Sequence, residues 1–237
     1  MGRSRAGVLW LVSDVCRHGR HWSHDHLVRL AAPRLTDRLR PLWNFDDLDT
    51  SERRFSKQLA QETIPAGRAE VLTQLARVEG LRGNFEGCAR LLDEAEPLAG
   101  DDAVANIRLE LERGRMYRST GDREAAFPLF KDAFARAVEA DERYLAGDAA
   151  HMCAISIEDR ALQEEWTQRG LDEGDPYWAG PLYNNLGVAH SEAGDHERAL
   201  ELFELALAAR LRDPENQQAI EWAREAVEEE KKLLVEA

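Results

Sequence analysis

The chain has 237 residues, of which 43% are hydrophobic and 32% are charged, and its formal net charge is −14. It has no apolar run long enough to span a bilayer, and its acidity argues against nonspecific binding to nucleic acid or to anionic membranes. Its cysteines are few and far apart (Cys16, Cys88 and Cys153), which is typical of a reducing compartment. A soluble, cytoplasmic protein is therefore expected.

Residues 1–41 differ from the rest of the chain in charge. Residues 1–40 hold eight Arg and three Asp, which gives this part +5 and leaves −19 for the remaining residues. A basic start followed by a short apolar run resembles a secretory signal, but no small-x-small cleavage site follows it. We interpret residues 1–41 as a basic, His-rich N-terminal extension that is poorly ordered, and residues 42–237 as the folded domain.

Four of the seven histidines lie within nine residues of this extension: His18, His21, His24 and His26. Imidazoles at this density can bind zinc, nickel or copper. No single regular element would gather all four, because the last two point apart on a helix. A solvated extension is the favoured interpretation, and a metal site is the remote alternative.

Each end of the folded domain is predicted to form a covering helix. At the first end, an acidic start and the stop signal Ile64-Pro65 predict a helix over 50–63. At the other end, the residues after Pro214 predict a helix over 215–236. Four of its apolar residues recur at helical spacing and are expected to face inward: Ile220, Ala223, Val227 and Leu234.

Between these helices one spaced pattern recurs. It consists of a small residue in a first helix, a glycine turn followed by Asp or Asn, and a large residue between two small ones in a second helix. The later copy, in residues 183–206, supplies Gly187, Gly194-Asp195, Ala199, Phe203 and Ala206. The copy in residues 109–133 supplies Gly114, Gly121-Asp122, Ala126, Phe130 and Ala133. A softer copy, in residues 75–95, supplies Ala76, Gly83-Asn84, Cys88, Leu92 and Ala95.

The three turn glycines lie 38 and 73 residues apart (Gly83, Gly121 and Gly194). Because the second gap is about twice the first, a degenerate fourth copy is expected in residues 140–175. Small side chains let two antiparallel helices approach where they cross, and the larger one fills the space between crossings. The glycine can adopt the left-handed conformation that closes the turn, and the Asp or Asn after it can cap the second helix.

These residues and offsets resemble the tetratricopeptide repeat. The resemblance implies an all-α solenoid of about four helix pairs, with a flanking capping helix at each end. The pairs are expected at about 69–99, 103–138, 142–173 and 179–211. Such repeats are general surfaces for binding other proteins, so the resemblance implies an adaptor or scaffold that binds a peptide or a helix of a partner protein on its concave face.

In this family the first helix of each pair lines the concave face. Five residues of those helices are candidate contacts to a partner: Arg77, Arg115, Arg118, Asn184 and Asn185. Guanidinium groups can pair with carboxylates, and an Asn amide can satisfy an extended backbone; the resemblance implies this second role for Asn185. Gln74 and Glu112 occupy the equivalent positions in earlier pairs, which argues against capture of a terminal carboxylate.

No feature of the sequence predicts an enzyme. It has no glycine-rich phosphate loop, no nucleophile in a sharp turn and no close carboxylate pair, so no cofactor is expected. His151 and Cys153 would point to different sides of a helix. A homo-oligomeric structural module is the alternative function. Five aromatic residues of the C-terminal half are expected to pack between helices: Trp166, Tyr177, Trp178, Tyr183 and Trp222.

Overall fold

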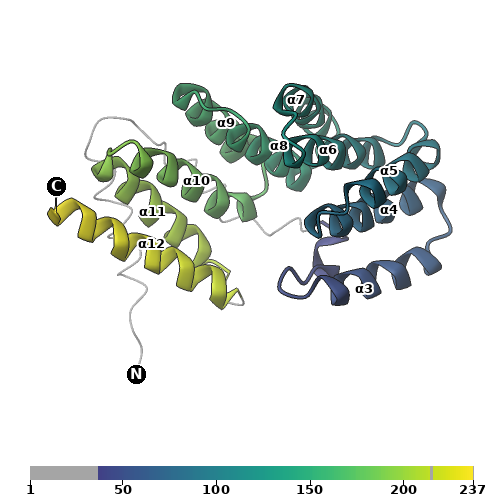
Figure 1. Cartoon of the computed structure of the whole chain (residues 1–237), viewed down its shortest axis with the longest axis horizontal. Helices are drawn as coiled ribbons and strands as arrows, with labels where there is room; N and C mark the ends of the chain where they lie inside the picture. The colour runs from purple at the N-terminus through teal and green to yellow at the C-terminus, as the bar shows by residue number, and fades with distance from the viewer. Residues whose placement is uncertain (1–36, 214–215, 237) are drawn as a thin grey trace.

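The computed structural model describes residues 37–213 and 216–236, and these residues form helices and turns without any strand. The helices stack into a curved array that starts at α3 (Leu48–Gln61) and ends at α12 (Gln217–Glu236) (Figure 1). Between them lie four antiparallel pairs: α4 (Pro65–Leu81) with α5 (Phe85–Ala99), α6 (Ala103–Ser119) with α7 (Arg123–Glu139), α8 (Arg143–Ile155) with α9 (Arg160–Glu173), and α10 (Ala179–Glu192) with α11 (His196–Arg210). The predicted all-α solenoid with flanking helices is confirmed. None of the described helices is long and apolar enough to cross a membrane.

A small residue on the first helix and a larger one on the second set the packing of each regular pair. A Cβ atom added to Gly114 would lie 2.4 Å from Cε1 of Phe130, and the equivalent glycine of α10 stands in the same relation to its phenylalanine. In the pair α4–α5 the sizes shift, because Ala76 and Leu92 occupy these positions and both are buried. What recurs is the combined volume of the two side chains.

The turn glycines adopt the predicted left-handed conformation, with φ of +77° at Gly83, +93° at Gly121 and +78° at Gly194. Asp122 caps α7 as predicted, since its carboxylate accepts a hydrogen bond of 3.0 Å from the Ala125 amide. The equivalent Asp195 makes no cap hydrogen bond of comparable geometry to α11, and its carboxylate lies 2.9 Å from Nδ1 of His190 on α10.

The third pair, α8–α9, departs from this pattern. Four residues, 156–159, separate its helices, whereas three separate α6 from α7. Counted from the capping aspartates of the second helices, Thr167 stands where Phe130 stands in α7. The close approach is made elsewhere, because a Cβ on Gly147 would lie 2.4 Å from Cδ1 of Trp178, which belongs to the short helix η2 (Pro176–Trp178).

The flanking helices cover the two ends of the array. Phe55 of α3 is fully buried, and on α12 three of the four residues predicted to face inward are buried: Ile220, Ala223 and Val227. The helix α3 begins two residues earlier than predicted, because Asp47 accepts a hydrogen bond of 3.0 Å from the Thr50 amide and so caps it.

Residues 37–47, here called the strap, precede α3 and include the short helix η1 (Arg40–Leu42). The sequence assigned residues 37–41 to a poorly ordered extension, and the structure corrects this. Leu39 is only 1% exposed, and together with Trp43 it packs against Phe55 and Val71. The described start of the chain is therefore part of the folded body.

Candidate functional site

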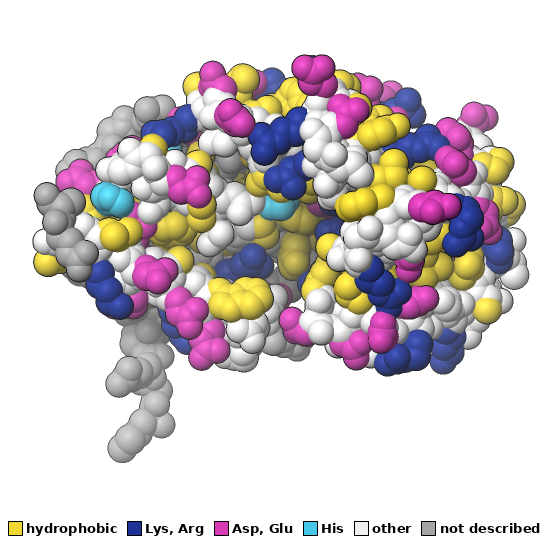
Figure 2. Space-filling model, viewed as in Figure 1, with side chains coloured by type: hydrophobic (Ala, Val, Ile, Leu, Met, Phe, Trp, Pro, Cys, Tyr) yellow, Lys and Arg dark blue, Asp and Glu magenta, His cyan; other side chains and the backbone are white. Residues whose placement is uncertain are grey.

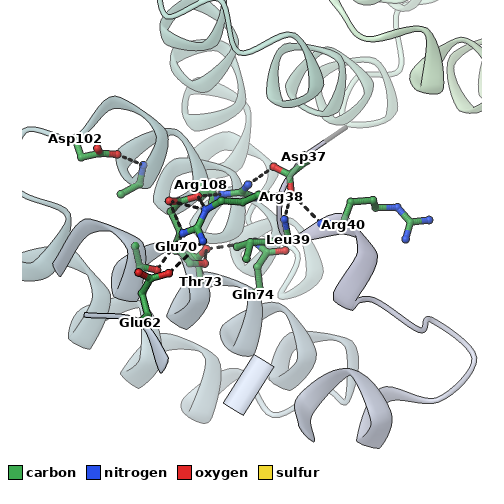
Figure 3. Close-up of polar contacts among 12 residues, drawn as sticks. Asp37, Arg38, Leu39, Arg40, Glu62, Glu70, Thr73, Gln74, Asp102 and Arg108 are labelled. Carbon is green, nitrogen blue, oxygen red and sulfur yellow. Dashed lines mark hydrogen bonds and ion pairs between the residues drawn. The ribbon is translucent and has the colours of Figure 1, made fainter. Parts of the chain in front are cut away.

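The strap is fixed to the first two helix pairs by charged side chains that converge on Glu70 of α4 (Figure 3). Arg38 donates to Glu70 at 2.7 Å, and Arg108 of α6 donates to the same carboxylate at 3.1 Å. Asp37 pairs with Arg108 from the other side. Burial alone would lower the pKa of Arg108, but the charges of Asp37 and Glu70 raise it. This guanidinium is therefore charged and is held by two carboxylates.

Beyond this cluster the strap crosses the concave face. The indole N–H of Trp43 donates to Gln74 of α4 at 3.0 Å, and the Trp43 ring stacks on Phe45 with centroids 4.7 Å apart. Arg40 reaches a different part of the array, because its Nη2 donates to the hydroxyl of Tyr177 at 3.2 Å. The strap thus connects the first helix pair to the connection that precedes the fourth.

Beneath the strap lies a cluster of buried charges. Arg115 donates to Glu112 at 2.6 Å and to Asp148 of α8 at 2.5 Å. Arg77 of α4 lies farther away, with Nη1 3.7 Å from Glu112 and 3.8 Å from Asp148. Burial would raise the pKa of Asp148, but the charges of Arg115 and Arg77 lower it below its usual range. Both carboxylates are held by Arg115, whereas Arg77 has no hydrogen bond to any described residue.

His151, one turn beyond Asp148 on α8, is held in its neutral form. Burial lowers its pKa to about 4, although the charge of Asp148 acts in the opposite direction. The Asn185 side-chain nitrogen lies 2.7 Å from Nε2 of this ring. Since an amide nitrogen can only donate, Nε2 accepts and the ring proton is on Nδ1. Nδ1 is buried and has no hydrogen-bond partner among the described residues.

These groups surround a partly open cavity of about 210 Å³. Five aromatic side chains line it, and two of them, Trp43 and Phe45, belong to the strap. Besides the charged cluster and His151, the lining residues include Arg40, Trp43, Phe45, Gln74, Tyr144, Met152, Tyr177 and Trp178. A small molecule of limited size would fit here.

A wider groove of about 810 Å³ opens between the strap and the helices α10–α12. Figure 2 shows the hollow near the middle of the molecule, with basic and hydrophobic side chains inside it. Its far wall carries Trp222, which is 59% exposed, so the prediction that the five C-terminal aromatic residues pack between helices fails for this one. Trp166, Trp178 and Tyr183 are buried as predicted.

The structure places the five predicted contact residues in three different surroundings. Arg77 and Arg115 line the cavity, and Asn185 binds His151 at its edge. Asn184 lines the open groove. Arg118 lies apart from both and donates to the Ile155 carbonyl at 3.2 Å.

The strap residues and the polar residues of α8 were not among the residues predicted from the sequence. Asp148 and His151 did carry a signal, since they interrupt an otherwise apolar stretch of that helix. The strap aromatics carried none. The four histidines proposed as a remote metal site lie outside the described residues. Within those residues, no group of three or more His, Cys, Asp or Glu could hold a metal ion.

Comparison with known proteins supports the fold. A tetratricopeptide repeat family model matches residues 182–212, which contain most of α10 and all of α11. No curated protein matches the chain. The matched unit has the glycine turn and the Gly187–Phe203 contact that α6–α7 also uses. The chain therefore contains a tetratricopeptide repeat at residues 182–212, and the recurrence of its turn and contact in α6–α7 supports a tetratricopeptide repeat fold for the array.

Proposed function

We propose that this protein is an interaction module that binds a peptide segment of a partner protein in the open groove between the strap and α12. The observation that carries the proposal is an unused amide in that groove. Asn184 lines it, and its side chain makes no hydrogen bond to any described residue, whereas the side chain of its neighbour Asn185 contacts His151. A free amide can both donate to and accept from an extended backbone.

The groove also offers an apolar anchor and local positive charge. Trp222 is exposed on its far wall, and exposed Trp side chains are over-represented among residues that dominate binding energy. Three arginines and two aspartates line the groove, so it carries a small positive excess in a protein of net charge −14: Arg40, Arg54, Arg210, Asp46 and Asp213. A segment with an apolar residue beside an acidic one fits these features.

The first contacts to test are therefore Asn184 and Trp222. Arg115 and Asn185 are weaker choices, because their polar groups are already used inside the fold. Replacing them would change the stability of the protein as well as its surface, so a loss of binding would be ambiguous.

The test is affinity capture from native lysate with the full chain, followed by titration of the captured protein's binding segment by calorimetry. We expect Asn184→Ala with Trp222→Ala to weaken that segment at least tenfold. Leu162→Ala is the matched control, since Leu162 is 43% exposed on α9 and does not line the groove. Equal affinity for all three proteins would refute the groove assignment. Capture of sister chains alone would favour the homo-oligomeric alternative.

A further inference from the structure

The side chains that line the cavity of about 210 Å³ have an excess of unpaired donors. Four buried nitrogens of lining residues lack a hydrogen-bond partner among the described residues: Nε of Arg40, Nε of Arg77, Nδ1 of His151 and Nε1 of Trp178. No lining residue has a buried side-chain oxygen that lacks a hydrogen-bond partner. Because buried N–H groups are almost always paired in folded proteins, four of them around one cavity need an explanation.

The charges of the lining residues also favour an anionic occupant. Four arginines and three carboxylates line the cavity: Arg40, Arg77, Arg108, Arg115, Asp37, Glu112 and Asp148. The carboxylates are hydrogen-bonded to Arg108 and Arg115, while the nearest carboxylate oxygens to Arg77 are beyond hydrogen-bond distance. Among the lining residues the positive charges exceed the negative ones by one, and Arg77 and Arg40 each have a guanidinium nitrogen without a partner among the described residues. An occupant with one negative charge would balance this excess.

The aromatic residues that line the cavity limit which kind of anion can bind there. Trp43, Phe45, Tyr144, Tyr177 and Trp178 line the cavity, and they suit a planar apolar body more than a fully hydrated inorganic ion. The volume of about 210 Å³ corresponds to roughly seven water molecules at about 30 Å³ each. A small aromatic acid falls within this size, and a nucleotide does not.

We propose that the cavity binds a small organic monoanion, a carboxylate on a planar apolar body, whose oxygens accept hydrogen bonds from Arg77, His151 and Trp178. The apolar body lies against the aromatic walls. Arg40, Trp43, Phe45 and Tyr177 line both the cavity and the open groove, so the two share a wall, but the residues proposed to bind the anion differ from Asn184 and Trp222 of the groove.

The test uses the full chain labelled with ¹⁵N and titrated with benzoate, phenylacetate and indole-3-acetate, each beside its neutral amide. The indole N–H signal of Trp178 is assigned through Trp178→Phe. We expect at least one acid to shift this signal downfield and to bind at least tenfold more tightly than its amide. Peptides ending in an aromatic residue form a second arm, and binding of those peptides without binding of the free acids would refute the small-molecule site.

Two variants sharpen the result. Arg77→Gln removes the charge without breaking a hydrogen bond to a described residue, so we expect it to fold and to weaken the acid at least tenfold while leaving the amide unchanged. Arg123→Gln is the control, since Arg123 forms its ion pair with Glu158 at an exposed position away from the cavity. If no acid shifts the Trp178 signal, if acid and amide bind alike, or if Arg77→Gln binds the acid as tightly as wild type, the proposal is wrong.

Discussion

The second and third helix pairs solve the same packing problem in different ways. In α6–α7 the contact is made inside the pair, where Gly114 admits the ring of Phe130. In α8–α9 a glycine of the first helix admits Trp178, which comes from the following connection. In the regular pair, the repeat residues serve only to pack the two helices against each other. The irregular one brings Asp148, His151 and Trp178 to a cavity, so the departure from the repeat marks the candidate site.

The strongest link between the two pairs is Arg115, and breaking it has the largest expected effect. Arg115→Ala leaves Glu112 and Asp148 buried without their hydrogen-bonded partner, which should cost about 3–5 kcal/mol in the free energy of unfolding. Urea unfolding followed by circular dichroism measures this loss.

Arg113 on the same helix is the matched control. It forms a bidentate pair with Glu96 at 2.9 and 3.0 Å, but the Glu96 side chain is 59% exposed, so Arg113→Ala should cost less than about 1 kcal/mol. If the two variants lose the same stability, the charge cluster does not hold the second and third pairs together.

The third pair should also give the protein a distinctive pH dependence. The pKa of His151 is about 4 in the folded protein and about 6.5 when the ring is exposed. Between these values the unfolded chain binds the proton and the folded one does not, so stability falls as the pH drops from 6.5 to 4. The loss is about 3 kcal/mol at pH 4, since one pKa unit is about 1.4 kcal/mol.

Comparing His151→Gln with wild type isolates this contribution, because the carboxylates titrate in both proteins. The free energy of unfolding of the variant should fall less steeply between pH 6.5 and 4. Parallel curves for the two proteins would mean that His151 is not held neutral by the fold.

In the second pair, we expect one substitution to restore the stability that another removes. Gly114→Ala drives a methyl group into the ring of Phe130 and should cost about 1–3 kcal/mol. Adding Phe130→Leu recreates the Ala76–Leu92 combination of the first pair and should recover most of the loss. A double-mutant cycle in urea measures the coupling, and a double variant no more stable than Gly114→Ala would show that combined volume is not what the repeat preserves.

The smallest expected change in stability is for the two aspartates that follow turn glycines, Asp122 and Asp195. Asp122→Ala removes a cap hydrogen bond and should cost about 1 kcal/mol. Asp195→Ala removes a contact to His190 instead, and because that carboxylate is about half exposed the loss should be smaller. Thermal unfolding of both variants compares them, and a larger loss for Asp195→Ala would reverse the assignment of the caps.

The fold was predictable because each repeat makes the same local contacts, so the turn glycines and the alternation of small and large residues are visible in the sequence. The site was only half predictable. Arg77 and Arg115 follow from their position on the first helices, but which residues face them does not. The strap contacts are non-repeating and long-range, and no periodic signal records that Arg40 meets Tyr177 or that Trp43 meets Gln74.

The long-range contacts of the strap change how the array is expected to unfold. Solenoids usually hold together through nearest neighbours alone, so their ends can fray independently. Here Asp37 and Arg108 are 71 residues apart, and Arg40 and Tyr177 are 137 apart. Opening the first or the second pair, or displacing η2, breaks a contact to the strap. We therefore expect the strap to make the unfolding of this array more cooperative, as in a globular domain, although its helices are arranged as a chain of repeats.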